Sequence, residues 1–124
     1  MALRVQPSES SSWSIGAISQ HNGGGSYMGI LILLEAQAKP ADISDVKSYM
    51  AEIIPDTRTY DGCQKIDVYF NTEHTDSMVA VEHWDSRAHY EKYLTWRKET
   101  GVLDKLDAML AGPPSIRYFE RIDT

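Results

Sequence analysis

The residues best suited to chemistry lie in one short segment, residues 81–101. Glu82 and Trp84 are two positions apart in a stretch that alternates as a β-strand, so their side chains point to the same face. A carboxylate at the end of an apolar strand must either pair with a cation or hold a proton more tightly than it does in water. Glu82 is therefore a candidate general acid or base, and an ion pair with Arg97 or Arg117 is the simple alternative.

The helix predicted after this strand adds further polar and aromatic side chains. Tyr93 and Arg97 are four residues apart, and Trp96 is three beyond Tyr93, so they are neighbours on one side of the helix. Together with Glu82 and Trp84 they can wall a pocket between sheet and helix, one that fits a flat, partly apolar ligand. The alternative is that both tryptophans are ordinary core residues, since large aromatic side chains dominate protein cores.

Other residue types that carry chemistry are too few or wrongly placed. His83 and Asp85 share a strand face but are only two ligands, whereas metal sites use three or four. Cys63 is the one cysteine and follows a turn glycine, where a small buried thiol is more common than a nucleophile. The glycines at residues 23–25 lead into a strand and not into a helix, so they do not form a phosphate-binding loop. We expect neither a metal nor an organic cofactor.

Composition bounds the class of protein and its partners. The 124 residues, 42% of them hydrophobic, are enough for one domain with one core. The formal net charge is −6 and the basic residues are scattered, which argues against nucleic acid and anionic membranes as partners. The longest apolar run, residues 28–34, is too short to cross a bilayer. A single cysteine and the lack of a signal-peptide pattern favour a cytoplasmic protein.

The chain divides into an extension and a domain. Residues 1–27 are rich in serine and glycine and have few apolar anchors, which predicts an N-terminal extension. Residues 28–124 have a regular pattern that predicts one folded domain. Strands are predicted at residues 29–38, 64–71, 78–84 and 115–122. One helix is predicted at residues 43–59, and a pair of helices within residues 87–110, the second of them at 102–110.

The order of these elements predicts an α+β fold of the ferredoxin-like βαββαβ type, in which helices cover one face of an antiparallel sheet. The strands predicted at residues 29–38 and 78–84 are apolar on both faces. Large apolar patches are rare on the surfaces of monomers, so the face without helices needs a cover. We therefore expect a homodimer in which a second copy covers it.

Five short motifs in this domain resemble those of a known family. They are KPADI, TRTYDGCQKIDVY, VEHW, AHYEKYLTWRKETG and GPPSIRYFE, in this order. With them the chain resembles the antibiotic biosynthesis monooxygenase family. The resemblance implies a homodimeric α+β barrel, in which two sheets pack face to face. Members of the family include cofactor-independent oxygenases, haem-degrading enzymes and an isomerase.

Two residues narrow the activity that the resemblance implies. Related quinol oxygenases commonly have a histidine where Tyr93 stands, and a phenol with a pKa of about 10 is a weaker proton acceptor. No histidine follows His89, which argues against haem degradation. We therefore predict a cofactor-independent monooxygenase that uses O2 on an electron-rich quinol, phenol or anthrone-type polyketide.

Roles for the candidate residues follow from this chemistry. Glu82 is the predicted base, and Tyr93 and Arg97 are predicted to bind the developing oxyanion. The predicted substrate-binding residues are Trp84, Trp96 and Tyr69. Two other functions remain open: an isomerase or cyclase that uses the same groups without O2, and a dimer that binds a small molecule without turnover.

Overall fold

The computed structural model describes residues 29–124, so the predicted extension at residues 1–27 and Met28, the first residue of the predicted domain, lie outside the described residues. The elements are β1 (Ile30–Gln37), the short 3-10 helix η1 (Pro40–Asp42), α1 (Ile43–Arg58), β2 (Cys63–Phe70), β3 (Ser77–Trp84), α2 (Arg87–Glu99), α3 (Val102–Ala108) and β4 (Ser115–Glu120). The predicted order of strands and helices is confirmed.

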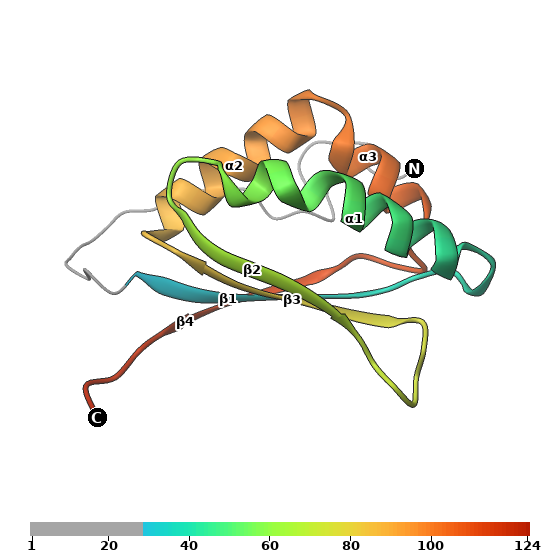
Figure 1. The fold of residues 1–124 in the computed structure, drawn as a ribbon, viewed down its shortest axis with the longest axis horizontal. Helices are drawn as coiled ribbons and strands as arrows, with labels where there is room; N and C mark the ends of the chain where they lie inside the picture. Colours follow the sequence, from blue (N-terminus) through green and yellow to red (C-terminus); the bar gives the residue numbers. More distant parts are fainter. Residues whose placement is uncertain (1–28) are drawn as a thin grey trace.

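The four strands form one antiparallel sheet in the order β2-β3-β1-β4. All the helices lie on one side of this sheet, and the other side carries none of the described elements (Figure 1). This is the ferredoxin-like α+β arrangement that the sequence predicts. Between Gly29 and Thr124, no helix is both long enough and apolar enough to cross a membrane.

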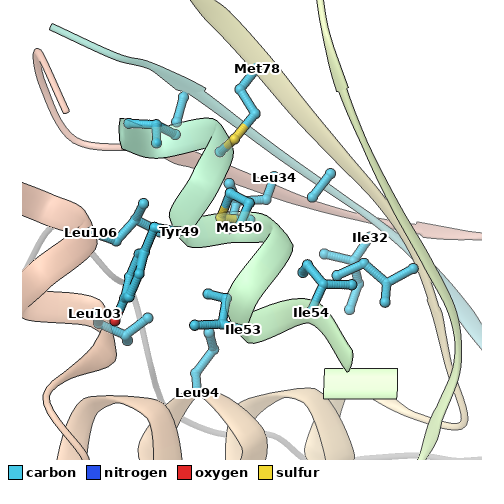
Figure 2. Packing of buried hydrophobic residues seen from close by; sticks show 14 of the residues in the cluster. Ile32, Leu34, Tyr49, Met50, Ile53, Ile54, Met78, Leu94, Leu103 and Leu106 are labelled. Carbon is cyan, nitrogen blue, oxygen red and sulfur yellow. The ribbon is translucent and has the colours of Figure 1, made fainter. Parts of the chain in front are cut away.

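The core lies between the sheet and the helices. Alternate residues of β1 and β3 face it, among them Ile32 and Ala80, which are 0% and 1% exposed. The stripe of α1 residues spaced by three and four positions packs onto them. Figure 2 shows Tyr49 of this stripe beside Leu103 and Leu106 of α3. The buried residues of α1 therefore lie on one side of the helix.

The opposite face of the sheet is also partly apolar. On the two central strands Leu33 of β1 lies opposite Val81 of β3, and both are half-buried. Towards the edges Tyr69 of β2 is 55% exposed and Phe119 of β4 is 39% exposed. We call the face that carries these four residues the open face. Its composition agrees with the predicted homodimer, which stays a prediction.

Two local features place α2 over the end of β3. The Ser86 hydroxyl accepts a hydrogen bond of 3.1 Å from the backbone N–H of His89, so Ser86 caps α2. Gly62, just before β2, has φ of 92°, and a Cβ there would lie 2.5 Å from the His89 side chain. Only glycine permits both the backbone angle and the close approach. The end of β3, the start of β2 and the first turn of α2 therefore meet at one place.

Candidate functional site

Glu82 is the buried acid of the candidate site. It lies near the end of β3 on the helix-covered face, and only 2% of it is exposed. Its Oε1 accepts a hydrogen bond of 2.9 Å from Nε1 of Trp84, which is fully buried. Burial raises the pKa of Glu82 from its ordinary 4.5 to about 7, against the opposite effect of the bond from Trp84. A carboxyl group with a pKa near neutral can both accept and return a proton.

The sequence left open an ion pair between Glu82 and either Arg97 or Arg117. Neither arginine forms it. Arg117 lies on the open face and bonds Glu35 at 3.0 Å. Arg97 is buried but donates its hydrogen bonds to other oxygens. Among residues 29–124, no cation forms an ion pair with Glu82. Its ionised form is therefore destabilised by burial without compensation from an opposite charge.

Arg97 is the centre of a buried hydrogen-bond network that is separate from the Glu82–Trp84 bond. Its Nε donates to Oη of Tyr93 at 3.0 Å, and its Nη2 donates to the carbonyl oxygen of Ile53 at 2.7 Å and to Oγ1 of Thr57 at 3.0 Å. The Tyr93 and Thr57 hydroxyls lie 2.6 Å apart. The guanidinium group also lies over the Trp96 ring, 4.5 Å from its centroid. Tyr93 and Arg97 thus use these donors for hydrogen bonds to each other and to α1. Fewer donors are left to bind a substrate oxyanion than the sequence predicts.

An aromatic cluster joins the two polar groups. We define it as Tyr60, Trp84, Tyr90, Tyr93 and Trp96. The ring centroid of Trp84 lies 5.0 Å from that of Tyr93 and 5.4 Å from that of Tyr90. Tyr60 stacks on Trp96 at 5.1 Å and meets Tyr93 edge-on at 5.3 Å. Trp84, Tyr93 and Trp96 therefore lie in one cluster, as the sequence predicts, and Trp84 connects this cluster to Glu82.

Tyr90 and Tyr93 of this cluster have little tendency to ionise. Burial raises the pKa of Tyr93, although its bonds to Thr57 and Arg97 act in the opposite direction. Burial also raises the pKa of Tyr90 well above 10, and the nearby charge of Glu82 adds to the effect. Both phenols therefore stay protonated at neutral pH, whereas Glu82, which is bonded to Trp84 of the cluster, can act as a base there.

Tyr69 is not part of this site. It lies on β2 with its side chain on the open face, opposite Val79, whereas Glu82 and Trp84 face the helices. Side chains of adjacent residues in a strand point to opposite faces, so Tyr69 lies on the other side of the sheet from the buried Ile66. The structure therefore does not bring Tyr69 together with Trp84 and Trp96, the other predicted substrate-binding residues. Tyr69 is instead part of the predicted dimer face.

Three residues of the site were missed in the sequence. Thr57 and Tyr60 come from the end of α1 and the turn after it, and Tyr90 comes from the first part of α2. A signal existed for Tyr90, which precedes Tyr93 by three positions and so lies on the same helix side. Thr57 follows Ile53 by four positions on the apolar stripe of α1. For Tyr60 the sequence offered no comparable signal.

Among the described residues, no group of three or more His, Cys, Asp or Glu side chains could hold a metal ion. Asp85 accepts a hydrogen bond of 2.8 Å from Gln64. His83 lies on the open face, opposite Leu31 of β1. Neither side chain of this pair is therefore part of a larger group of metal-ligand side chains among residues 29–124.

Thr57→Val is expected to lower the free energy of unfolding by about 1–3 kcal/mol. Valine keeps the shape of threonine but leaves the Tyr93 hydroxyl and one N–H of Arg97 without their buried partner. Urea denaturation at one protein concentration measures the change. Thr95→Val is the control, because Thr95 is exposed and bonds only the carbonyl oxygen of Glu91 in its own helix. Equal stability of Thr57→Val and the unmodified protein would show that the network does not hold the site together.

The fold and the buried acid beside an aromatic cluster define a small α+β protein of the ferredoxin-like type with polar groups buried between sheet and helices. The sequence model of the family described as "Antibiotic biosynthesis monooxygenase" matches residues 29–97, which is more than half of the chain. The chain belongs to the antibiotic biosynthesis monooxygenase family. The match includes β1 to β3 and Arg87–Arg97 of α2, and so contains Glu82, Trp84, Tyr93 and Arg97.

Solved structures share the fold. A conserved protein from Methanosarcina mazei Go1 is 17% identical, with a TM-score of 0.70 over 77% of this chain and 95% of that chain. An antibiotic biosynthesis monooxygenase is 17% identical, with a TM-score of 0.70 over 76% of this chain and 99% of that chain. Rv0793 from Mycobacterium tuberculosis is 19% identical, with a TM-score of 0.64 over 77% and 96%. At these identities the likeness shows the fold alone. No curated protein matches the chain.

Proposed function

We propose that this protein is a cofactor-independent monooxygenase that acts on an electron-rich hydroxyaromatic compound, a quinol, phenol or anthrone. The observation that carries the proposal is the state of Glu82: buried, bonded to Trp84, and with a pKa of about 7. Perturbed carboxyl groups of this kind are typical of general bases. Membership of a family named for monooxygenases supports the same reading.

The proposed reaction needs no external reductant. In the example of anthrone, a CH2 carbon loses both hydrogens and becomes a carbonyl, which is a four-electron oxidation. One oxygen atom of O2 enters the carbonyl, and the other leaves as water with the two hydrogens. A quinol that becomes a hydroxyquinone balances in the same way. The substrate thus supplies every electron that O2 receives, so the protein has to supply only binding, a base and a dry environment.

Glu82 has the first role in this reaction. Its carboxylate removes a proton from the substrate, and the resulting anion is electron-rich enough to give an electron to O2. The surrounding rings of Trp84, Tyr90 and Tyr93 exclude water, which strengthens electrostatic interactions in the site. The proton held by Glu82 can then return when the O–O bond breaks and water leaves. The apolar rings also suit a flat aromatic substrate.

Oxygen uptake tests the proposal. Anthrone and 1,4-naphthohydroquinone are added to the protein in air, and O2 consumption is followed together with quinone formation. His83→Gln is the matched control for Glu82→Gln, because His83 is the next residue of β3 but faces the open side. We expect uptake that Glu82→Gln removes and His83→Gln keeps. Turnover of a substrate without O2 would support an isomerase or cyclase, and binding without any turnover would support a ligand-binding dimer.

The proposal also includes a homodimer formed through the open face. Two half-buried aliphatic side chains lie at its centre, Leu33 and Val81, with Tyr69 and Phe119 beyond them. Contiguous apolar patches beyond roughly 300–600 Å² are uncommon on monomers. A second sheet packed on this face would remove the patch from water and give the β-sheet a cover on both sides.

Val81→Lys is expected to turn the homodimer into a monomer, because it places a charge at the centre of the proposed interface, where a lysine has no partner. Light scattering after size exclusion should give about twice the 14.0 kDa chain mass for the unmodified protein and the mass of one chain for the variant. Glu99→Lys, on the exposed end of α2, is the control and should stay dimeric. A single-chain mass for the unmodified protein at micromolar concentration would refute the dimer.

A further inference from the structure

The hydroxyl group of Tyr118 has an unusual position. Among the buried side-chain nitrogen and oxygen atoms of residues 29–124, it is the one that has no hydrogen-bond partner. A buried hydroxyl without a partner loses its bonds to water and gains nothing in return, so it destabilises the folded protein. Such a group calls for an explanation, and a role in binding is one that the position of Tyr118 supports.

Tyr118 lies at the β4 side of the candidate site. Ile32 of β1 is opposite Glu82 on one neighbouring strand and opposite Tyr118 on the other, so the three residues share one row of the helix-covered face. The ring of Tyr90 meets Trp84 edge-on at 5.4 Å and Tyr118 edge-on at 6.1 Å. Tyr118 therefore continues the aromatic cluster towards the edge of the sheet.

Burial keeps the phenol of Tyr118 protonated. Burial raises the pKa of Tyr118 to about 12, with smaller increases from Glu91 and Glu82 and a decrease from Arg87. At neutral pH the group is thus a neutral phenol with an O–H to donate. The hydroxyl of Tyr93, by contrast, is already bonded to Thr57 and Arg97.

Arg87 covers the Tyr118 ring from the outside. Its guanidinium carbon lies 3.9 Å from the ring centroid, and its Nε bonds Glu91 at 3.0 Å. The Arg87 side chain is 52% exposed and that of Glu91 is 13% exposed. Arg87 therefore lies between the Tyr118 ring and solvent.

We propose that Tyr118 is a further substrate-contacting residue, whose hydroxyl donates a hydrogen bond to an oxygen of the aromatic substrate as Glu82 removes the proton. The proposal rests on the proposed function. It transfers to Tyr118 the oxyanion role that the sequence assigns to Tyr93 and Arg97, because the donors of those two residues bond each other and α1. The substrate class that fits is an aromatic compound with a phenolic or keto oxygen on the ring that contacts Tyr90.

Tyr118→Phe distinguishes a binding role from a structural one. The variant keeps the ring under Arg87 and removes only the hydroxyl without a partner. We expect it to unfold at a higher urea concentration than the unmodified protein, and to bind 1-naphthol about tenfold more weakly, the effect of one lost hydrogen bond. Binding of naphthalene, which has no oxygen, should not change. If Tyr118 had only a structural role, Tyr118→Phe would not raise stability and at the same time weaken the binding of 1-naphthol but not of naphthalene.

Tyr93→Phe is the matched control, because it removes a hydroxyl that has partners, and it should unfold at a lower urea concentration. The inference about Tyr118 is overturned if Tyr118→Phe is no more stable than the unmodified protein, or if it binds 1-naphthol equally well. Equal binding would leave the proposed function in place. If the unmodified protein binds neither 1-naphthol nor naphthalene, the proposed function fails and this inference fails with it.

Discussion

Glu82→Gln is expected to lower turnover by about 10² to 10⁴, the range that a positioned acid-base group contributes. Glutamine keeps the shape of the side chain, and its carbonyl oxygen can still accept the hydrogen bond from Trp84. What it loses is the ability to take a proton. We therefore expect affinity for the aromatic substrate to change little. The measurement is steady-state O2 uptake as a function of substrate concentration, so that turnover and KM are obtained separately.

The same variant should change how stability depends on pH. In the folded protein Glu82 has a pKa of about 7, against 4.5 in the unfolded chain, so between these values the folded state binds the proton more tightly. The contribution of Glu82 to stability is thus fully present below pH 4.5 and is lost as the pH rises to about 7. The loss corresponds to about 3 kcal/mol. Glutamine does not titrate, so the variant lacks this loss.

Urea denaturation at pH 4.5 and at pH 8 measures this effect. The difference in unfolding free energy between Glu82→Gln and the unmodified protein should move by about 3 kcal/mol in favour of the variant from the lower to the higher pH. Using the difference cancels the titration of other groups. The protein concentration has to be the same throughout, because a dimer gains stability with concentration. A constant difference would show that Glu82 is ionised as readily as a carboxylate in water.

Trp84→Ala is expected to lower the free energy of unfolding by about 3–5 kcal/mol, the usual cost of removing a buried tryptophan. Trp84 is 0% exposed and contacts the rings of Tyr60, Tyr90 and Tyr93, so alanine leaves a cavity at the centre of the aromatic cluster. It also removes the hydrogen bond to Glu82. Binding of aromatic compounds should weaken as well.

Two further variants separate these effects. Trp96→Ala is the packing control, and it should cost less because Trp96 is only half-buried and lies at the margin of the cluster. Trp84→Phe keeps an aromatic ring but removes the N–H that lowers the pKa of Glu82. The pH at which turnover rises should therefore move above about 7 in Trp84→Phe. A small stability loss in Trp84→Ala, similar to that of a surface substitution, would contradict the central position of this residue.

The local pattern of the sequence determined the elements and most of their buried sides. Alternation placed Glu82 and Trp84 on one face of a strand, and helical spacing placed Tyr93 and Arg97 on one side of a helix. Both statements hold because side-chain direction depends on neighbours only a few positions away. The order of the elements then determined the ferredoxin-like topology, because connections between elements are short and do not cross, which leaves few possible arrangements.

Local alternation left undetermined which face of the sheet the helices cover. Val79 and Val81 make one face of β3 apolar, and Met78 and Ala80 make the other apolar too. In β2, alternation places Tyr69 on the face opposite to Ile66, Val68 and Phe70. The packing of the helices decided that Met78 and Ala80 are in the core, and this placed Tyr69 on the open face.

Tertiary structure alone decided the partners of the polar groups. Thr57 meets Arg97 across 40 positions of chain, and Tyr118 joins the row of Glu82 through β1. Such contacts depend on how α1 and α2 are rotated against each other and on which strand fills the edge of the sheet. The absence of a cation beside Glu82 among the described residues, and hence its pKa of about 7, depends on the same packing. A carboxylate in a sequence has many possible partners, and only the folded chain decides which of them come within reach.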